Sequence, residues 1–286
     1  GIRLLTENTS EMLGSEFFFK KLEQAKILRE EILGIHRTSN CYRLVHGEAD
    51  GLSGLIIDKF ADVFVVEPYS AGYIGIMEWI ASSLQSLYPG SRIVVRPDER
   101  IAVKEGTDFS KVAKAYPSPD FIEISENLLR MKVNLKTGHK TGFFLDQREN
   151  RLTLSQYCHG KEVLDCFCYT GGFSISAMLA GAKSASAIDL DEKALETARE
   201  NARLNSANVT FQHVNAFDHL RMMISKGMQA DIVILDPAKL AGCTEEISRA
   251  QRTYGDIHKL GMQVVSPGGI LLTCSCSGLI SEMDFL

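Results

Sequence analysis

Two short segments near the end of the chain carry side chains that could drive covalent chemistry. Asp236 follows an apolar run at 232–235, and Cys276 follows another at 270–272, within Cys-Ser-Cys-Ser-Gly. Beside a methyl donor, a thiolate that adds to carbon 6 of a pyrimidine lets carbon 5 attack the methyl, after which a base removes the carbon 5 proton and the thiol leaves. A carboxylate bonded to the N3/N4 edge of cytosine favours that addition. Asp236 and Cys276 are therefore the predicted catalytic residues.

The cysteines allow two other interpretations. The pairs Cys166/Cys168 and Cys274/Cys276 could form a four-thiolate zinc site, but another strand is expected between those that carry them, so we predict no metal. Core filling is expected for Cys166, Cys168 and Cys274, because free cysteine is among the most buried residue types. Cys276 differs because it lies in a polar Ser-Cys-Ser-Gly sequence. On a strand, Cys274 and Cys276 would face the same way, and Lys239 would help to form the thiolate.

A glycine turn near the middle of the chain predicts a cofactor site. The sequence at 164–173 places Asp165, Thr170, Gly171 and Gly172 between a strand and a helix. Ligands of open α/β sheets bind at that edge, where glycines allow close approach and the helix offers free N–H groups. The turn lacks the Gly-x-Gly-x-x-Gly pattern that cradles a pyrophosphate. It therefore favours S-adenosylmethionine over a dinucleotide.

The next two predicted strands also end in polar residues. Asp189 is placed to accept both ribose hydroxyls, and Asn215 could offer its amide to the adenine edge. Each feature has a structural interpretation as well: a Gly-Gly pair often makes only a tight turn, and an Asp at a strand end often caps a helix. Their order at successive strand ends favours the cofactor.

The elements that must position these residues alternate between strand and helix from residue 160 onward. Strands are predicted at 162–167, 184–190, 209–215, 230–236 and 268–276, with helices at 169–182, 192–205, 217–226 and 245–265. This alternation predicts an α/β fold, a Rossmann-like domain with a mainly parallel sheet.

The first half of the chain has a different pattern. It begins with an amphipathic helix at 14–33, followed by strands at 41–47, 53–60 and 62–69 with a tight turn at Ala61–Asp62. A helix near 72–88, a strand at 92–98 and a hairpin at 120–135, turning at 126–127, complete it. We expect an N-terminal helical linker segment at 1–36, a small mixed α/β domain at 37–135 that is a candidate for RNA binding, and the methyltransferase domain at 136–286.

Composition and net charge exclude several classes of protein. No run approaches the ~18 apolar residues of a membrane span. The net charge of −5 excludes a polycation, so nucleic acid would have to bind a local basic patch. Seven cysteines, an odd number, fit reduced thiols in the cytoplasm better than a disulfide framework.

Four segments, at 138–151, 163–177, 235–239 and 275–279, together resemble the bacterial large-subunit (23S) ribosomal RNA cytosine-C5 methyltransferases. These S-adenosylmethionine enzymes have a PUA domain, a small central α/β domain, which 42–60 resembles, and a class I Rossmann-like domain. The resemblance implies Cys276 as the nucleophile and Asp236 as the acid that contacts the base. It also implies a cofactor pocket made by the glycine turn, the strand ends and a closing hairpin: Phe144, Asp146, Gln147, Asp165, Tyr169, Thr170, Gly171, Gly172, Asp189, Leu190, Asn215, Ala216 and Asp236.

The chain departs from the family pattern in places. The family usually has a second proline where this chain has Ala238, and an aspartate where it has Asn215. We expect the PUA domain to be missing from the N-terminus and the last strands from the C-terminus. Large-subunit ribosomal RNA is the implied partner, a membrane is not, and a homodimer is left open.

Basic residues gather around the segment at 136–151. They could track RNA phosphates while neighbouring aromatic residues stack an unpaired base, although such charges often only solvate a hairpin. The predicted RNA-binding residues are Lys136, His139, Lys140, Arg148, Arg151 and Lys239.

Three alternative functions remain. A guanine-N7 methyltransferase of ribosomal RNA can share this architecture but needs no nucleophilic thiol. A catalytically silent RNA-binding factor of ribosome assembly could retain the fold without turnover. An NAD-dependent dehydrogenase fits least, because the glycine pattern is wrong.

Overall fold

The chain forms two compact units. The computed structural model describes residues 3–136 and 141–285. The first unit consists of Gly1–Asn127 and Lys132–Asp146, and the second of Leu128–Met131 and Gln147–Leu286. None of the helices in the described part of the chain has the length and apolar content needed to cross a membrane.

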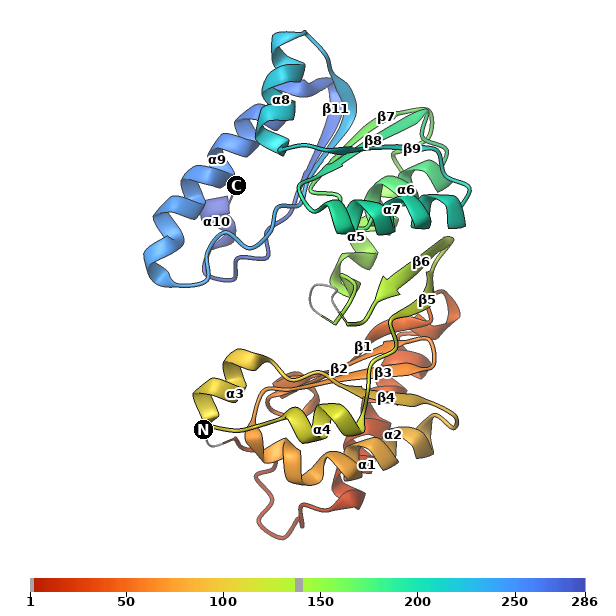
Figure 1. The fold of residues 1–286 in the computed structure, drawn as a ribbon, viewed down its shortest axis with the longest axis vertical. Helices are drawn as coiled ribbons and strands as arrows, with labels where there is room; N and C mark the ends of the chain where they lie inside the picture. The colour runs from red at the N-terminus through yellow and green to blue at the C-terminus, as the bar shows by residue number, and fades with distance from the viewer. Residues whose placement is uncertain (1–2, 137–140, 286) are drawn as a thin grey trace. The chain divides into compact units, whose positions relative to one another are not determined.

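The first unit is built on a four-stranded sheet in the order β1-β2-β3-β4 (Figure 1). β1 (Cys41–His46), β2 (Leu55–Phe60) and β3 (Val63–Pro68) are antiparallel neighbours, and β4 (Arg92–Val95) runs parallel to β3. The predicted tight turn between β2 and β3 is confirmed, with Ala61 in the left-handed conformation at φ 53°.

Side-chain alternation gives this sheet two different faces. Leu55 and Ile57 of β2 and Val66 of β3 are fully buried in one apolar core, with residues of α1 (Ser15–Lys26) and α2 (Met77–Leu87). Because successive side chains of a strand point to opposite faces, Ile56 and Glu67 lie on the other face. Residues of that second face line a cavity of the first unit.

Shorter elements complete the first unit. The predicted helix at 14–33 is α1 followed by a π-helix at Ile27–Ile32. The predicted hairpin is formed by β5 (Phe121–Glu126) and β6 (Leu129–Asn134), but it turns one residue later than expected because Asn127 takes the left-handed conformation. The others are 3₁₀ helices at Ile35–Arg37, Gly47–Asp50 and Ala71–Ile76, with α3 (Glu99–Glu105) and α4 (Ser110–Ala115).

The second unit is a parallel sheet in the order β11-β10-β7-β8-β9, flanked by helices (Figure 1). Its strands are β7 (Glu162–Cys166), β8 (Ser184–Asp189), β9 (Val209–His213), β10 (Ala230–Leu235) and β11 (Val265–Thr273). Its helices are α5 (Arg148–Ser155), α6 (Gly172–Leu179), α7 (Glu192–Leu204), α8 (Ala216–Ser225), α9 (Ile247–Val264) and α10 (Glu282–Phe285), with 3₁₀ turns at Leu145–Gln147 and Thr244–Glu246. The predicted Rossmann-like sheet is confirmed.

One strand ends earlier than predicted. β11 stops at Thr273, so Cys274 and Cys276 lie beyond the strand and the expectation that they face the same way is wrong. Cys274 is buried, at 8% exposure, whereas Cys276 is exposed. The backbone amide of Cys274 still bonds to the Leu235 carbonyl at 2.8 Å, and the residues at 274–277 form no regular secondary structure.

Candidate active site

The strand order fixes where a ligand can enter the second unit. The chain passes from β7 outward to β8 and β9, and then returns to place β10 on the other side of β7. Ligands of open α/β sheets bind outside the carboxyl ends of the strands at such a switch point. Cys166 and Leu235 are partners in the register of β7 and β10, so the loops that follow them begin side by side.

The loop after β7 has an unusual backbone. Phe167 and Tyr169 have positive φ angles of 66° and 50°, although neither is a glycine. Gly171, at φ 86°, precedes α6, and a Cβ there would lie 3.1 Å from Cδ1 of Ile175. Strained residues of this kind concentrate at ligand sites. The loop thus opens the N-terminus of α6 toward the switch point, as a cofactor loop requires.

Asp165 lies beneath this loop and is almost completely buried, at 1% exposure. One carboxylate oxygen accepts a hydrogen bond from the Ser174 amide at 3.0 Å, and the other has no partner among the described residues. Burial raises the pKa of Asp165 to about 7, and the charges of Asp236 and Asp189 add to the rise. A buried oxygen without a donor fits a ligand that brings one, such as the ammonium group of S-adenosylmethionine.

Asp189 ends β8 and is tied to the glycine loop. One of its oxygens accepts from the Tyr169 amide at 2.7 Å and the other from the Asp191 amide at 2.9 Å. Each oxygen keeps a lone pair for a further donor. The following residue, Leu190, is exposed and apolar, and its carbonyl lies 2.9 Å from Nε2 of His213.

Asn215 follows β9 and caps α8. Its Oδ1 accepts from the amides of Phe217 at 2.9 Å and Asp218 at 3.3 Å. Asn215 is thus the N-cap of α8 through its oxygen, and its Nδ2 donors take no part in the cap. Ala216, the first residue of α8, is buried. The role of both residues toward adenine stays a prediction.

Asp236 begins the loop after β10 and is half-buried. Gln147 donates from Nε2 to its Oδ2 at 3.1 Å, and the Oε1 of Gln147 accepts from Nδ2 of Asn150 at 2.6 Å. The thiol of Cys274 lies 3.9 Å from that same Oε1. Gln147, predicted as a cofactor residue, thus contacts the predicted catalytic acid.

Cys276 lies on a segment that is fastened to the same loop. Ser277 is buried, and its Oγ accepts from the amides of Leu240 at 3.0 Å and Ala241 at 3.2 Å. The hydroxyl of Tyr254 in α9 lies 2.9 Å from Oγ of Ser275 and 3.2 Å from Oγ of Ser277. Sequence reasoning missed Tyr254 and both serines. The only sequence signal was the pair of hydroxyl residues on either side of Cys276.

The other cysteines of the two pairs lie in the core. Cys166 and Cys168 are buried, and burial raises the pKa of both thiols well above the usual value. As expected, β10 lies between the strands that precede the two pairs. Among the described residues no group of three or more His, Cys, Asp or Glu side chains could hold a metal ion.

The predicted RNA-binding residues belong to both units of the chain. His139 and Lys140 lie outside the described residues. In the second unit, Lys239 is exposed and Arg148 bonds to Glu149 at 3.0 Å. Arg151 is only 4% exposed, and its guanidinium lies 6.0 Å from the ring centre of Phe173. That position offers RNA little surface.

Three further predicted residues belong to the first unit. Lys136 forms an ion pair with Asp120. Phe144 is half-buried and Asp146 is exposed. Their roles in RNA or cofactor binding stay predictions.

Comparison with known proteins identifies the family of the chain and its cofactor. A family model described as S-adenosylmethionine-dependent methyltransferase matches residues 113–286. The chain is 40% identical over 282 residues to the ribosomal RNA large subunit methyltransferase I of Pseudoalteromonas atlantica, and 39% identical over 287 residues to that of Aeromonas salmonicida. These alignments cover 98% and 99% of this chain, and 71% and 72% of the relatives.

Solved structures share the fold. A putative methyltransferase complexed with SAH superposes with a TM-score of 0.81 at 22% identity, and a putative SAM-dependent methyltransferase from Streptococcus mutans with 0.77 at 20%. Each match covers 96% of this chain and 71% of the other. The predicted methyltransferase fold and the predicted cofactor are confirmed. The chain belongs to the S-adenosylmethionine-dependent methyltransferases, in the family that includes the ribosomal RNA large subunit methyltransferase I proteins.

Proposed function

We propose that the chain methylates carbon 5 of a cytosine in large-subunit ribosomal RNA through a covalent Cys276 adduct. The names of its relatives support methyl transfer to that RNA. One observation carries the cytosine chemistry: an exposed thiol at 276 lies on a segment that Ser277 bonds to the loop beginning at Asp236. A homodimer and a cytoplasmic location stay predictions.

The thiol of Cys276 and the carboxyl group of Asp236 have different roles in the proposed reaction. Cys276, as a thiolate, forms a bond to carbon 6, while Asp236 in its protonated form donates to N3 and accepts from the N4 amino group of the base. The electron pair moved to carbon 5 takes the methyl group, and the sulfur that carried the methyl keeps the electrons of the broken bond. A base then removes the carbon 5 proton, and the electrons of that C–H bond expel Cys276 as a thiolate. Gln147, bonded to Asp236, keeps the carboxylate in place.

S-adenosylmethionine supplies an electrophilic methyl group on a sulfonium. In our proposal, Asp165 accepts a hydrogen bond from its ammonium group, Asp189 from its ribose hydroxyls, and Asn215 donates to adenine. Tyr169, Thr170, Gly171, Gly172, Leu190 and Ala216 complete the proposed pocket in the second unit. Carbon 5 is reachable only when the base leaves its stack, at a cost of a few kcal/mol. The cations proposed to meet RNA phosphates are Lys136, His139, Lys140, Arg148 and Lys239.

The decisive test is a covalent adduct with RNA that contains 5-fluorocytidine, measured by mass spectrometry. Fluorine blocks proton removal, so the wild-type adduct should persist and should require the methyl donor. Cys276→Ala should form no adduct and lose turnover by about 10³-fold or more. Cys243→Ala, another exposed cysteine of the second unit, is the matched control and should behave as wild type.

Other outcomes would identify the alternatives. Turnover retained in Cys276→Ala, with methylguanosine as the product, would replace our proposal with guanine-N7 methylation. A chain that binds ribosomal RNA but gives no heat with S-adenosylmethionine in calorimetry would be a silent assembly factor.

A further inference from the structure

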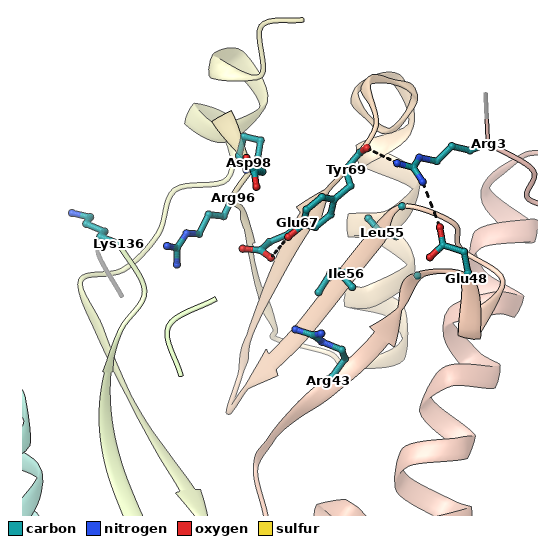
Figure 2. Close-up of a pocket in the computed structure, with 13 residues that line it drawn as sticks. Arg3, Arg43, Glu48, Leu55, Ile56, Glu67, Tyr69, Arg96, Asp98 and Lys136 are labelled. Atoms are coloured by element: carbon teal, nitrogen blue, oxygen red, sulfur yellow. Dashed lines mark hydrogen bonds and ion pairs between the residues drawn. The ribbon is translucent and has the colours of Figure 1, made fainter. Parts of the chain in front are cut away.

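The first unit contains a cavity of about 1070 Å³ that has no part in the proposed methyl transfer. It opens on the face of the sheet opposite to α1 and α2. Figure 2 shows charged side chains around it, with Glu67 and Tyr69 from the region of β3 and Arg96 from beyond β4. Its volume is sufficient for a nucleotide, since small-molecule sites usually measure about 300–1,000 Å³.

Strand register brings the charges of this face together. Arg43 of β1 is the partner of Asp58 in β2, and Ile56 of β2 is the partner of Glu67 in β3. The amide of Arg96 bonds to the carbonyl of Val66, next to Glu67, at 2.9 Å. The Glu67 carboxylate thus lies on the same sheet as Arg43, two strands away in β1, and Arg96, which follows the neighbouring strand β4.

Arg43 is held rigidly in this cavity. It donates from Nε and Nη2 to the two oxygens of Asp58, at 2.9 and 3.0 Å, and Asp58 is fully buried. Thr141 donates to the same carboxylate at 2.6 Å. Within the described part of the chain, these bonds and a contact with His46 engage three of the five N–H donors of Arg43. The guanidinium therefore retains donors for a ligand.

Glu67 provides a carboxylate that can accept hydrogen bonds from a ligand in the cavity. The only hydrogen bond it accepts among the described residues is a long one from the Tyr69 hydroxyl, at 3.3 Å. Burial and the nearby Asp58 raise the pKa of Glu67, while Arg96 and Arg43 oppose that rise and favour the ionised form. An ionised carboxylate presents two parallel acceptors to a ligand.

We propose that this cavity binds an unpaired guanine nucleotide of RNA, with Glu67 accepting hydrogen bonds from N1–H and the N2 amino group. Guanine is the one standard base whose Watson–Crick edge carries two adjacent donors. Adenine and cytosine offer a donor beside an acceptor, and uracil a donor between two acceptors. Arg43 and Arg96 supply donors for O6 of the base and for the phosphate.

Calorimetric titration of the full chain with GMP and IMP tests this site. IMP lacks the N2 amino group, so wild type should bind it roughly 10- to 100-fold more weakly than GMP, the range expected for a lost hydrogen bond to a charged group. Glu67→Gln should weaken GMP by a similar factor and bring the GMP and IMP affinities close together. Glu78→Gln, an exposed change on α2, should match wild type.

The inference is overturned if GMP and IMP bind equally, if CMP or AMP binds as tightly as GMP, or if GMP does not bind at millimolar concentration. CMP binding that becomes tighter than GMP binding at low pH would also contradict the proposal. It would show that a protonated Glu67 bonds to the cytosine edge, where a donor lies beside an acceptor. Thermal melting of Glu67→Gln separates a lost contact from a lost fold. Titration with S-adenosylmethionine is independent of this cavity, so its result bears on the proposed function alone.

Discussion

At the scale of single residues, Asp165 has an environment far from that of an exposed carboxyl. Its side chain is 1% exposed, and burial holds its pKa at about 7 instead of 3.8. The folded state therefore keeps a proton that the unfolded state loses. Such a group stabilises the fold fully below about pH 3.8, and this contribution is lost as the pH rises through about 7.

Asp165→Asn should remove that pH dependence. Between pH 5 and pH 8 the free energy of unfolding of wild type should fall by roughly 2–3 kcal/mol relative to the variant, because one pKa unit corresponds to about 1.4 kcal/mol. Urea denaturation at both pH values measures this, with Asp256→Asn as an exposed control. Parallel pH profiles for wild type and Asp165→Asn would show that the carboxyl is ionised in the folded state. The same variant should bind S-adenosylmethionine more weakly, since its buried acceptor loses its charge.

At the scale of elements, the important feature is how α9 joins two loops. Tyr254 and Ser277 connect the end of β11 with the loop after β10, and these two segments carry the proposed nucleophile and acid. Neither residue is proposed to touch the cofactor. They are positioning residues, so they should affect turnover more than cofactor affinity.

We expect Ser277→Ala to lower kcat by about 10-fold or more, because two buried amides lose their acceptor and the loop loosens. Tyr254→Phe should have a smaller effect in the same direction. The dissociation constant for S-adenosylmethionine should stay within about twofold of wild type. Tyr157→Phe, at an exposed tyrosine of the same unit, is the control. A parallel loss of cofactor affinity would assign these residues to general stability instead.

At the scale of the whole molecule, each unit has its own apolar core. Leu22 is fully buried in the core of the first unit, and Val233 in a core of the second. A change in one core should act first on the unit that contains it. The proposed guanine cavity belongs to the first unit, whereas Cys276 and Asp236 belong to the second.

Leu22→Ala should destabilise the first unit by about 2–5 kcal/mol, as is usual for a buried leucine. Hydrogen exchange should show faster opening in β1–β4, while the affinity for S-adenosylmethionine is unchanged. Val233→Ala should instead lower the affinity for S-adenosylmethionine and speed hydrogen exchange in the sheet of the second unit, while exchange in β1–β4 is unchanged. If Leu22→Ala lowered the affinity for S-adenosylmethionine as strongly as Val233→Ala, the stabilities of the two cores would be coupled.

Sequence alone determined the elements and the edge where chemistry could occur. Strands such as 162–166 and 230–235 are short segments rich in apolar residues, and helices such as 192–204 have a clear period, because burial imposes these patterns locally. The order of strands and helices then placed Asp165, Asp189 and Asp236 at one edge of a parallel sheet.

Only the tertiary structure decided how those residues are held. That β11 stops before Cys274, that Ser277 bonds to Leu240 and Ala241, and that Arg151 is buried all depend on contacts between residues far apart in the chain. The cavity around Glu67 likewise depends on the register of four strands. Local periodicity carries no information about such pairings, since the same pattern fits several registers and several neighbours.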